Sequence, residues 1–415
     1  MRFYENFQNP ENAILVSVDT GDFDAQVSID ELEELAKTAG AQVVAKVIQK
    51  RDKPDAAIYV GTGRLEEIRE LGIANDADLL IFDAELSPSQ QRNIEKYTDI
   101  RVVDRTTLIL DIFAARAKSR EGKLQVELAQ LKYTLPRLSG KGIELSRLGG
   151  GIGTRGPGES KLESDRRHIR RRIDSLTQEL KEVEKRRNDL RTRRVKDGVE
   201  TVVIVGYTNA GKSTLMNQLT DAGVLAQDKL FATLDPTARA LVLPSGRKVM
   251  LIDTVGLVRR LPHRLVEAFK STLEEASMAD VILNVCDASS VEFKEHLEVT
   301  ERLLDDLGAN GKPMISILNK CDLVDFSDDF SSIGKCVPIS AKHGTGIDEL
   351  LVAIEKALPQ TRKRAVFLFP FDKVGLSSKI REDGVIFEEE YIESGLKIDA
   401  IIDISLLNEL KDYIF

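Results

Sequence analysis

One stretch near the middle of the chain, Gly206 to Thr214, has residue types and spacing that suit phosphate binding. It reads G-Y-T-N-A-G-K-S-T, follows the apolar run Thr201 to Val205 and leads into a helix start. Backbone N–H groups of such a turn and the positive end of the helix dipole face an anionic polyphosphate. The pattern predicts Lys212 on the β- and γ-phosphates and the Ser213 hydroxyl on Mg²⁺. An ordinary strand–turn–helix connection is the alternative, and average residue usage makes a chance match about a one per cent event.

The tetrapeptide Asn319 to Asp322 lies at the end of another predicted strand and indicates which nucleotide binds. A carboxylate at Asp322 can accept hydrogen bonds from N1–H and the N2 amine of guanine, and adenine offers neither, so a site of this kind rejects adenine strongly. Asn319 is expected to brace the loops or to meet the base edge, and the Lys320 stem to cover the ring. Ser340-Ala341-Lys342 is expected to supply a backbone N–H to the base oxygen. These elements together predict a GTP site.

The magnesium and γ-phosphate contacts are expected from residues between these motifs. Thr233 is the best candidate for the second protein hydroxyl on Mg²⁺, with Thr237 as a competitor. Asp253 suits a water-mediated contact to the ion, and the Gly256 N–H can sense the γ-phosphate. The predicted nucleotide-contacting set is Gly206, Tyr207, Thr208, Asn209, Ala210, Gly211, Lys212, Ser213, Phe231, Ala232, Thr233, Leu234, Asp235, Asp253, Thr254, Val255, Gly256, Asn319, Lys320, Cys321, Asp322, Ser340, Ala341 and Lys342.

The sequence assigns catalysis to Lys212, Thr233 and Gly256. The residue that follows Gly256 is also informative. Ras-like proteins place a water-orienting glutamine there, whereas this chain has Leu257. A leucine cannot orient water or transfer a proton, so we expect slow hydrolysis until a partner or another internal group completes the site. One hypothesis is that Asn209 coordinates a K⁺ ion at the phosphates. A structural loop role for this residue is the alternative.

Two switch segments, residues 226–238 and 254–264, are expected to become ordered around GTP and to be released on hydrolysis. The second contains three arginines, which either contact RNA or begin a solvated helix; they are Arg259, Arg260 and Arg264.

The elements that position these residues predict an α/β protein. Residues 11–104 alternate between apolar β-branched runs and helical patterns, which indicates a small parallel α/β domain. Ser28 with Glu31 resembles a capping box at a helix start. We predict four domains: an N-terminal parallel α/β domain, an antiparallel long-helix hairpin, a Ras-like P-loop domain and a small C-terminal α/β module, spanning 1–105, 106–198, 199–360 and 361–415.

The hairpin prediction depends on heptad spacing. Leucines repeat at alternating intervals of four and three from Leu124 to Leu138, and a second seam runs from Leu162 to Leu190, giving two helices of about 35 residues. The second arm, residues 161–197, holds 14 Lys/Arg against 8 Asp/Glu. The connector, residues 139–160, has eight glycines in 22 residues. A solvated coiled-coil face and a flexible linker are the plain alternatives to a basic rod and loop that contact RNA phosphates.

Bulk composition excludes several classes of protein. The net charge of −9 argues against a uniformly basic nucleic-acid-binding coat. The three cysteines have no metal-binding spacing, so reduced thiols are expected. No apolar run is long enough for a membrane span. We therefore expect a monomeric cytoplasmic protein, and peripheral membrane association stays open.

In these motifs the chain resembles the HflX-type GTPases of the Obg–HflX group. The resemblance covers essentially the whole chain, and its family-specific parts are F-A-T-L-D, residues 231–235, and the loop G-I-G-T-R-G-P-G-E, residues 151–159. It implies a GTPase that uses Mg²⁺, binds the large ribosomal subunit and splits stalled or idle ribosomes, with the hairpin loop pointing toward the peptidyl transferase region. The candidate rRNA contacts are Arg155, Arg166, Arg167, Arg170, Arg171 and Arg172.

Two other functions remain open at this point. One is a GTP-dependent regulatory switch that binds a protein partner through the hairpin, and ribosome-stimulated hydrolysis would argue against it. The other is the GTPase part of an RNA-modifying system. That function needs a second catalytic site, and no cofactor motif or nucleophilic cysteine setting is found outside residues 199–360.

Overall fold

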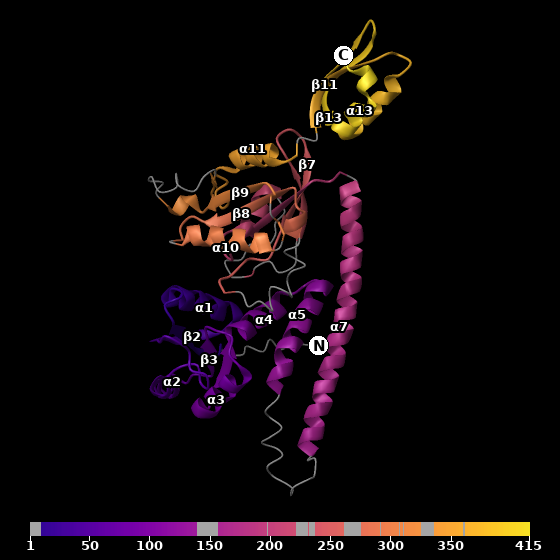
Figure 1. Cartoon of the computed structure of the whole chain (residues 1–415). Helices are drawn as coiled ribbons and strands as arrows, with labels where there is room; N and C mark the ends of the chain where they lie inside the picture. Colours follow the sequence, from indigo (N-terminus) through magenta and orange to yellow (C-terminus); the bar gives the residue numbers. More distant parts are fainter. Residues whose placement is uncertain are drawn as a thin grey trace, which may run out of the picture.

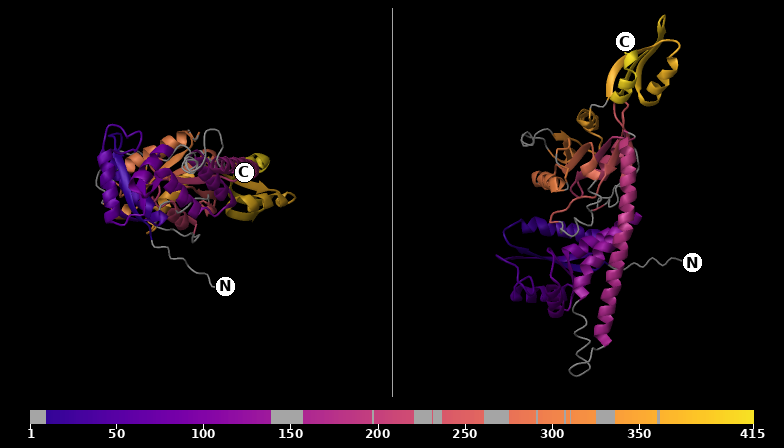
Figure 2. Two further views of the ribbon diagram at one scale, coloured as in Figure 1. Left: turned by 90° about the horizontal axis from the view of Figure 1, so that it is seen from below. Right: turned by 45° about the vertical axis from the view of Figure 1, so that its right-hand side comes forward.

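The computed structural model describes most of the chain, namely residues 10–138, 157–196, 198–220, 231, 237–260, 275–290, 292–306, 308–309, 311–324, 336–359 and 362–415. Figure 1 shows the N-terminal and nucleotide domains beside one long helix, α7 (Pro157–Lys196), with the C-terminal module beyond the nucleotide domain. The second view in Figure 2, turned about the vertical axis, shows the same arrangement.

The N-terminal domain is a parallel α/β sheet, as predicted. Its elements are β1 (Asn12–Asp19), α1 (Ala25–Ala39), β2 (Gln42–Lys50), α2 (Thr62–Ala74), β3 (Leu79–Phe82), α3 (Pro88–Thr98) and β4 (Arg101–Asp104), with strand order β2-β1-β3-β4. The expected capping box at Ser28 is wrong. Helix α1 begins one turn earlier, because Asp24 caps it by accepting from the Gln26 and Val27 N–H groups. Ser28 instead donates to the buried carboxylate of Asp83 at 2.6 Å.

The helical region consists of α4 (Arg105–Arg116), α5 (Arg120–Thr134), the short 3₁₀ helix η1 (Leu135–Leu138) and α7. The first arm is shorter than predicted, since Ala117 is extended and Ser119 caps a new helix. Helix α5 lies along α7 (Figure 1), and ion pairs Glu121–Arg187 and Glu127–Arg172 show that the two helices run in opposite directions.

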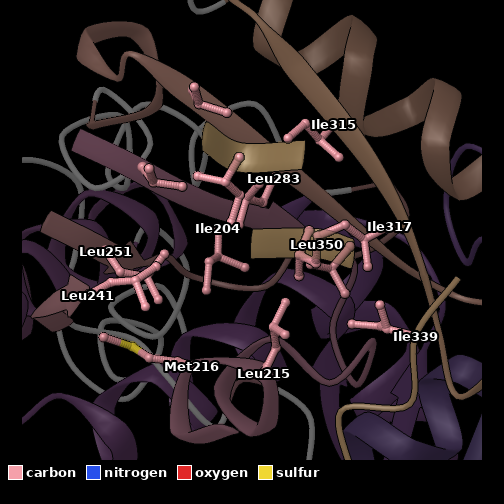
Figure 3. Close-up of a cluster of buried hydrophobic side chains, with 14 of the residues drawn as sticks. Ile204, Leu215, Met216, Leu241, Leu251, Leu283, Ile315, Ile317, Ile339 and Leu350 are labelled. Atoms are coloured by element: carbon pink, nitrogen blue, oxygen red, sulfur yellow. The ribbon is translucent and has the colours of Figure 1, made fainter. Parts of the chain in front are cut away.

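The nucleotide domain is a six-stranded sheet with helices on both faces. Its elements are β5 (Thr201–Gly206), α8 (Lys212–Thr220), β6 (Thr237–Val242), β7 (Lys248–Asp253), β8 (Val281–Asp287), α10 (Phe293–Asp306), β9 (Met314–Asn319), η2 (Cys321–Leu323), β10 (Cys336–Pro338) and α11 (Ile347–Ala357). The order is β10-β9-β8-β5-β7-β6, with β6 antiparallel to β7. Figure 3 shows the apolar core, including Ile204, Leu215 and Leu283, that holds β5 and α8 together.

The C-terminal module is an antiparallel sheet of order β11-β13-β12, packed against short helices. Its elements are β11 (Arg362–Phe369), η4 (Val374–Leu376), α12 (Ser377–Asp383), β12 (Val385–Ile392), β13 (Gly395–Asp403), α13 (Ile404–Glu409) and η5 (Lys411–Tyr413). Among the described helices of the whole chain, none combines the length and the apolar composition needed to cross a bilayer.

Candidate functional site

The predicted phosphate-binding turn lies between β5 and α8, at the carboxyl edge of the central strands of the sheet. Gly206 has φ 141° and Gly211 has φ 90°. A Cβ atom on Gly206 would lie 2.1 Å from the Val285 carbonyl oxygen, and one on Gly211 would lie 2.1 Å from Asn319 Nδ2. Only glycine therefore fits at these two positions, which is why the turn follows the glycine spacing of the sequence.

Lys212 occupies the first turn of α8 with its ammonium group buried. Its Nζ donates to the carbonyl oxygens of Gly206 at 3.0 Å and Tyr207 at 2.7 Å. Burial lowers the pKa of Lys212 to about 8, against the opposing effect of the Asp253 carboxylate. A buried cation with neutral partners is poised to gain the negative charge of a polyphosphate.

The predicted magnesium end of the site combines a hydroxyl with a carboxylate. Ser213 Oγ donates to Asp253 Oδ2 at 3.0 Å, and the neighbouring Thr254 hydroxyl donates to the Ile204 carbonyl at 2.8 Å. Oxygen donors of this kind fit Mg²⁺, which takes few protein ligands and completes its shell with phosphate oxygens and water. Within the described part of the chain no group of three or more His, Cys, Asp or Glu side chains is arranged to hold a metal by itself. Thr233, with 232–236 as a whole, lies outside the described residues.

The predicted base-binding motifs meet at the other end of the turn. Asn319 Nδ2 donates to the Ala210 carbonyl at 2.8 Å, and its Oδ1 accepts from the Ala341 N–H at 2.9 Å. One side chain thus ties three sequence-distant segments together, which is the bracing arrangement rather than a contact to the base edge. The Ser340 hydroxyl donates to Asp322 Oδ1 at 2.6 Å and holds the pKa of that carboxyl below its usual range. Asp322 is therefore a charged acceptor, as guanine recognition requires.

The residue at the glutamine position, Leu257, does not face the phosphate end. Its side chain is 4% exposed and belongs to the apolar core of the nucleotide domain. Its backbone pairs with the phosphate-binding turn, since the Thr208 N–H donates to the Leu257 carbonyl at 2.7 Å and the Leu257 N–H to the Gly206 carbonyl at 3.1 Å. Any group that replaces the glutamine must come from elsewhere.

The structure also shows functional contacts between domains that the sequence motifs do not predict. The buried Arg105 guanidinium, at the start of α4, donates to Asp83 Oδ1 at 2.7 Å and Glu31 Oε1 at 2.8 Å. It also donates to the Arg259 carbonyl at 3.0 Å, in the second switch segment. Tyr207, in the phosphate-binding turn, donates its hydroxyl to Glu31 Oε2 at 3.2 Å. Arg105 directly follows β4, and no sequence motif marks it.

The ring of Tyr207 has a second partner in the nucleotide domain. It stacks on His296 of α10 with the ring centroids 3.9 Å apart. Burial lowers the pKa of His296 to about 4, with the positive charge of Arg259 acting in the same direction, so this histidine is neutral at physiological pH. His296 is therefore a packing residue.

Phe231 of the first switch segment and two valines of the second pack into the core beside α4. Phe231, the first residue of F-A-T-L-D, is 2% exposed and lies edge-on to Phe113 of α4, with centroids 4.6 Å apart. Val255 and Val258 from the second switch segment join the same core. The sequence assigned Phe231 to the nucleotide; the structure places its side chain in a core shared by the N-terminal α/β domain and helices α4 and α5.

The switch arginines have partners that neither sequence alternative foresaw. Arg260 pairs with Asp83 at 3.4 Å and lies over the Phe23 ring at 4.1 Å, while Arg259 pairs with Glu292 at 2.6 Å. Both side chains are thus engaged within the chain. Arg264 lies outside the described residues.

The arginine cluster on α7 is only partly free to meet a partner. Arg167, Arg170 and Arg171 are exposed, and Arg166 is partly exposed. Arg172 instead makes a paired contact with Glu127 of α5, at 2.7 and 2.8 Å. Arg155 lies outside the described residues.

The site combines a phosphate-binding turn between β5 and α8, a charged carboxylate suited to guanine and a hydroxyl–carboxylate pair suited to Mg²⁺, all on one edge of this sheet. This arrangement is that of a P-loop GTPase. Three family models match the chain: GTP-binding GTPase N-terminal over residues 26–114, GTP-binding GTPase Middle Region over 116–194, and 50S ribosome-binding GTPase over 201–320.

Whole-chain relatives identify the family. The GTPase HflX of Caldanaerobacter subterraneus is 51% identical over 98% of this chain and 94% of its own length, and that of Escherichia coli is 41% identical over 94% and 92%. The chain belongs to the HflX family of GTPases. A crystal structure of a GTP-binding protein from Sulfolobus solfataricus with GDP is 27% identical, covering 84% of this chain and 98% of that one, with a TM-score of 0.45.

Proposed function

We propose that this GTPase binds the large ribosomal subunit in its GTP form and dissociates stalled or idle ribosomes, especially under stress. The observation that carries the proposal is the row of exposed arginines on α7, a 40-residue helix that runs alongside the GTPase domain. Arginine suits RNA phosphates because its planar guanidinium makes paired hydrogen bonds. The family model named for 50S ribosome binding, which matches residues 201–320, supports the same partner.

Arg167, Arg170 and Arg171 are the strongest described candidates for rRNA contact, with Arg166 at their edge. Arg172 is the weakest of the cluster, because its guanidinium already has a carboxylate partner in Glu127. Arg155 stays a candidate from its place in the glycine-rich loop.

In the nucleotide site, we propose that Ser213 and Thr233 bind Mg²⁺ and that Asp253 contacts the ion through water. Lys212 and the Gly256 N–H hold the γ-phosphate. Asn209 has an exposed side chain and φ 60°, beside the phosphate-binding turn, and is the proposed K⁺ ligand. Equal GTPase rates in K⁺ and Na⁺ would exclude that ion. The protein is proposed to act as a cytoplasmic monomer.

The decisive experiment measures GTP turnover with and without purified large and small subunits, and pelleting of the protein with each subunit in a non-hydrolysable GTP analogue. We expect stimulation and pelleting with the large subunit. Loss of 70S light scattering on adding protein and GTP, or the analogue, then tests splitting and shows whether it needs hydrolysis.

A double variant, Arg167→Ala with Arg171→Ala, tests the arm. We expect weaker pelleting and a shallower dependence of binding on salt, since fewer counterions are released. Lys294→Ala with Arg302→Ala on α10 removes the same charge from another exposed helix and serves as the control. Unchanged pelleting of the arm variant would exclude these arginines as the contact to the large subunit. GTPase stimulation by a protein partner, but not by ribosomal subunits, would favour a regulatory switch.

A further inference from the structure

Thr208, in the phosphate-binding turn, has a buried hydroxyl without a hydrogen-bond partner. The residue is 8% exposed, and its Oγ1 finds no donor or acceptor among the described residues. Most buried polar atoms in proteins are paired, and leaving one unpaired costs stability. An orphaned hydroxyl at this place therefore suggests a partner that arrives with the substrate.

The surroundings of Gly256 show where that partner lies. A Cβ atom added to Gly256 would lie 3.0 Å from Lys212 Nζ, 2.7 Å from Thr208 Cγ2 and 3.0 Å from Thr208 Cα. In a P-loop site the lysine Nζ contacts the β- and γ-phosphate oxygens. Lys212 Nζ and the Thr208 side chain thus lie on the same side of Gly256, so the Thr208 side chain borders the place where a γ-phosphate that contacts Nζ would lie. One staggered rotation about χ1 brings its hydroxyl to the place that the methyl group now occupies.

The neighbouring groups at this end are already committed or chemically unsuitable. Ser213 Oγ is bonded to Asp253, and the Thr254 hydroxyl to the Ile204 carbonyl. The side chain at the glutamine position, Leu257, is aliphatic and faces the core. Thr208 is therefore the hydroxyl that the described part of the site leaves available beside the γ-phosphate.

We propose that the Thr208 hydroxyl is a catalytic group that takes over the positioning role of the missing glutamine. It accepts a hydrogen bond from the attacking water and donates one to a γ-phosphate oxygen, which a hydroxyl can do at once. The water oxygen forms the new bond to the γ-phosphorus, and the bond from that phosphorus to the β–γ bridging oxygen breaks, with its electron pair leaving on GDP. The water proton passes to the phosphate product, so Thr208 keeps its own proton throughout.

Two near-isosteric variants separate this role from packing. Thr208→Val removes the hydroxyl and keeps the branched shape, whereas Thr208→Ser keeps the hydroxyl and removes the methyl group. We expect Thr208→Val to lower the single-turnover hydrolysis rate by roughly 10- to 100-fold, the effect of one hydrogen bond to a charged group. Thr208→Ser is expected to retain most of the rate. Affinities for GDP and for a non-hydrolysable GTP analogue are expected to change by less than about threefold in both variants, because the bond forms fully only in the transition state.

Binding of GDP with aluminium fluoride, which resembles the transition state, gives a readout that packing alone would not change. It is expected to weaken in Thr208→Val and not in Thr208→Ser. The proposal is overturned if Thr208→Val hydrolyses GTP at the wild-type rate, if both variants lose the same activity, or if ground-state nucleotide affinity falls as far as the rate. Each measurement is made with the full chain in K⁺ and again in Na⁺, so that a contribution from a monovalent ion is seen separately.

Discussion

Lys212 illustrates how burial of one side chain prepares the site for charge. In the nucleotide-free protein its pKa lies near 8, because burial disfavours the ammonium form. The phosphates favour that form and raise the pKa, so binding takes up a proton and affinity falls as the pH rises through 8. We expect the dissociation constant for GDP to rise about tenfold between pH 7 and pH 9.

Calorimetric titration in two buffers of different ionisation enthalpy measures this proton uptake directly. Lys212→Met is the control, since it binds weakly but has no proton to take up at this position. Proton uptake that is zero in the wild type, or equal in the variant, would contradict the prediction.

At the base end, Asp322→Asn is predicted to change which base is bound. The amide loses two charge-assisted acceptor contacts to guanine, so GTP affinity is expected to fall by about 10²- to 10⁴-fold. Xanthine has a carbonyl where guanine has its N2 amine, so xanthosine triphosphate binding is expected to improve. Fluorescence competition with both nucleotides checks this. Ser340→Ala removes the 2.6 Å bond to Asp322 and the acceptor of the His343 N–H, and it is expected to weaken GTP binding while guanine stays the preferred base. An Asp322→Asn variant that still prefers guanine would disprove the assignment.

Among the elements, the junction of β4 and α4 connects the N-terminal domain to the second switch segment. Arg105 there has a 2% exposed side chain and neutralises Asp83, which is 0% exposed. Arg105→Met leaves two carboxylates in a buried site, and we expect the N-terminal domain to lose about 3–5 kcal/mol of stability. Burial already raises the pKa of Glu31, so the deficit is expected to shrink as the pH falls toward 5 and Glu31 takes up a proton.

Hydrogen exchange of the buried β1 amides measures this opening free energy in the intact chain. Arg101→Met removes an exposed partner of Glu11 near the same strand and is expected to cost only about 0–1 kcal/mol. An equal loss of opening free energy in the two variants would show that the buried ion pairs of Arg105 stabilise the domain no more than an exposed pair does.

In the whole molecule, α7 is joined to the nucleotide domain through Glu275, which follows the undescribed residues 261–274. Arg191 contacts Glu275 at 3.1 Å through Nε, and their side chains are 12% and 11% exposed. Arg191→Met is expected to weaken this connection and to separate thermal unfolding into two calorimetric transitions, because a largely buried ion pair transmits cooperativity between the domains. The exposed neighbour Arg193→Met is the control. A single unchanged transition in the first variant would refute this coupling.

Much of the GTPase site can be predicted from the sequence because its motifs are short and contiguous. Gly206 and Gly211 take positive φ within one turn, and the predicted guanine acceptor, Asp322, belongs to a second short motif. The groups that exclude a Cβ at the two glycines, on Val285 and Asn319, are in contrast distant along the chain. The alternating domains and the basic second arm are likewise set by short-range periodicity, which one sequence displays. These predictions needed no knowledge of which segments meet.

Tertiary structure alone decided the contacts between domains. Tyr207 and Glu31 are 176 positions apart, and nothing local to either residue indicates that their side chains meet. For the same reason the sequence did not show three other contacts. These are the hydrogen bond from Ser28 to Asp83, the packing of Phe231 on Phe113, and the ion pair between Arg172 and Glu127. A hydrogen bond or buried ring needs a partner brought near by the fold, and the identity of that partner depends on the packing of whole elements rather than on spacing along the chain.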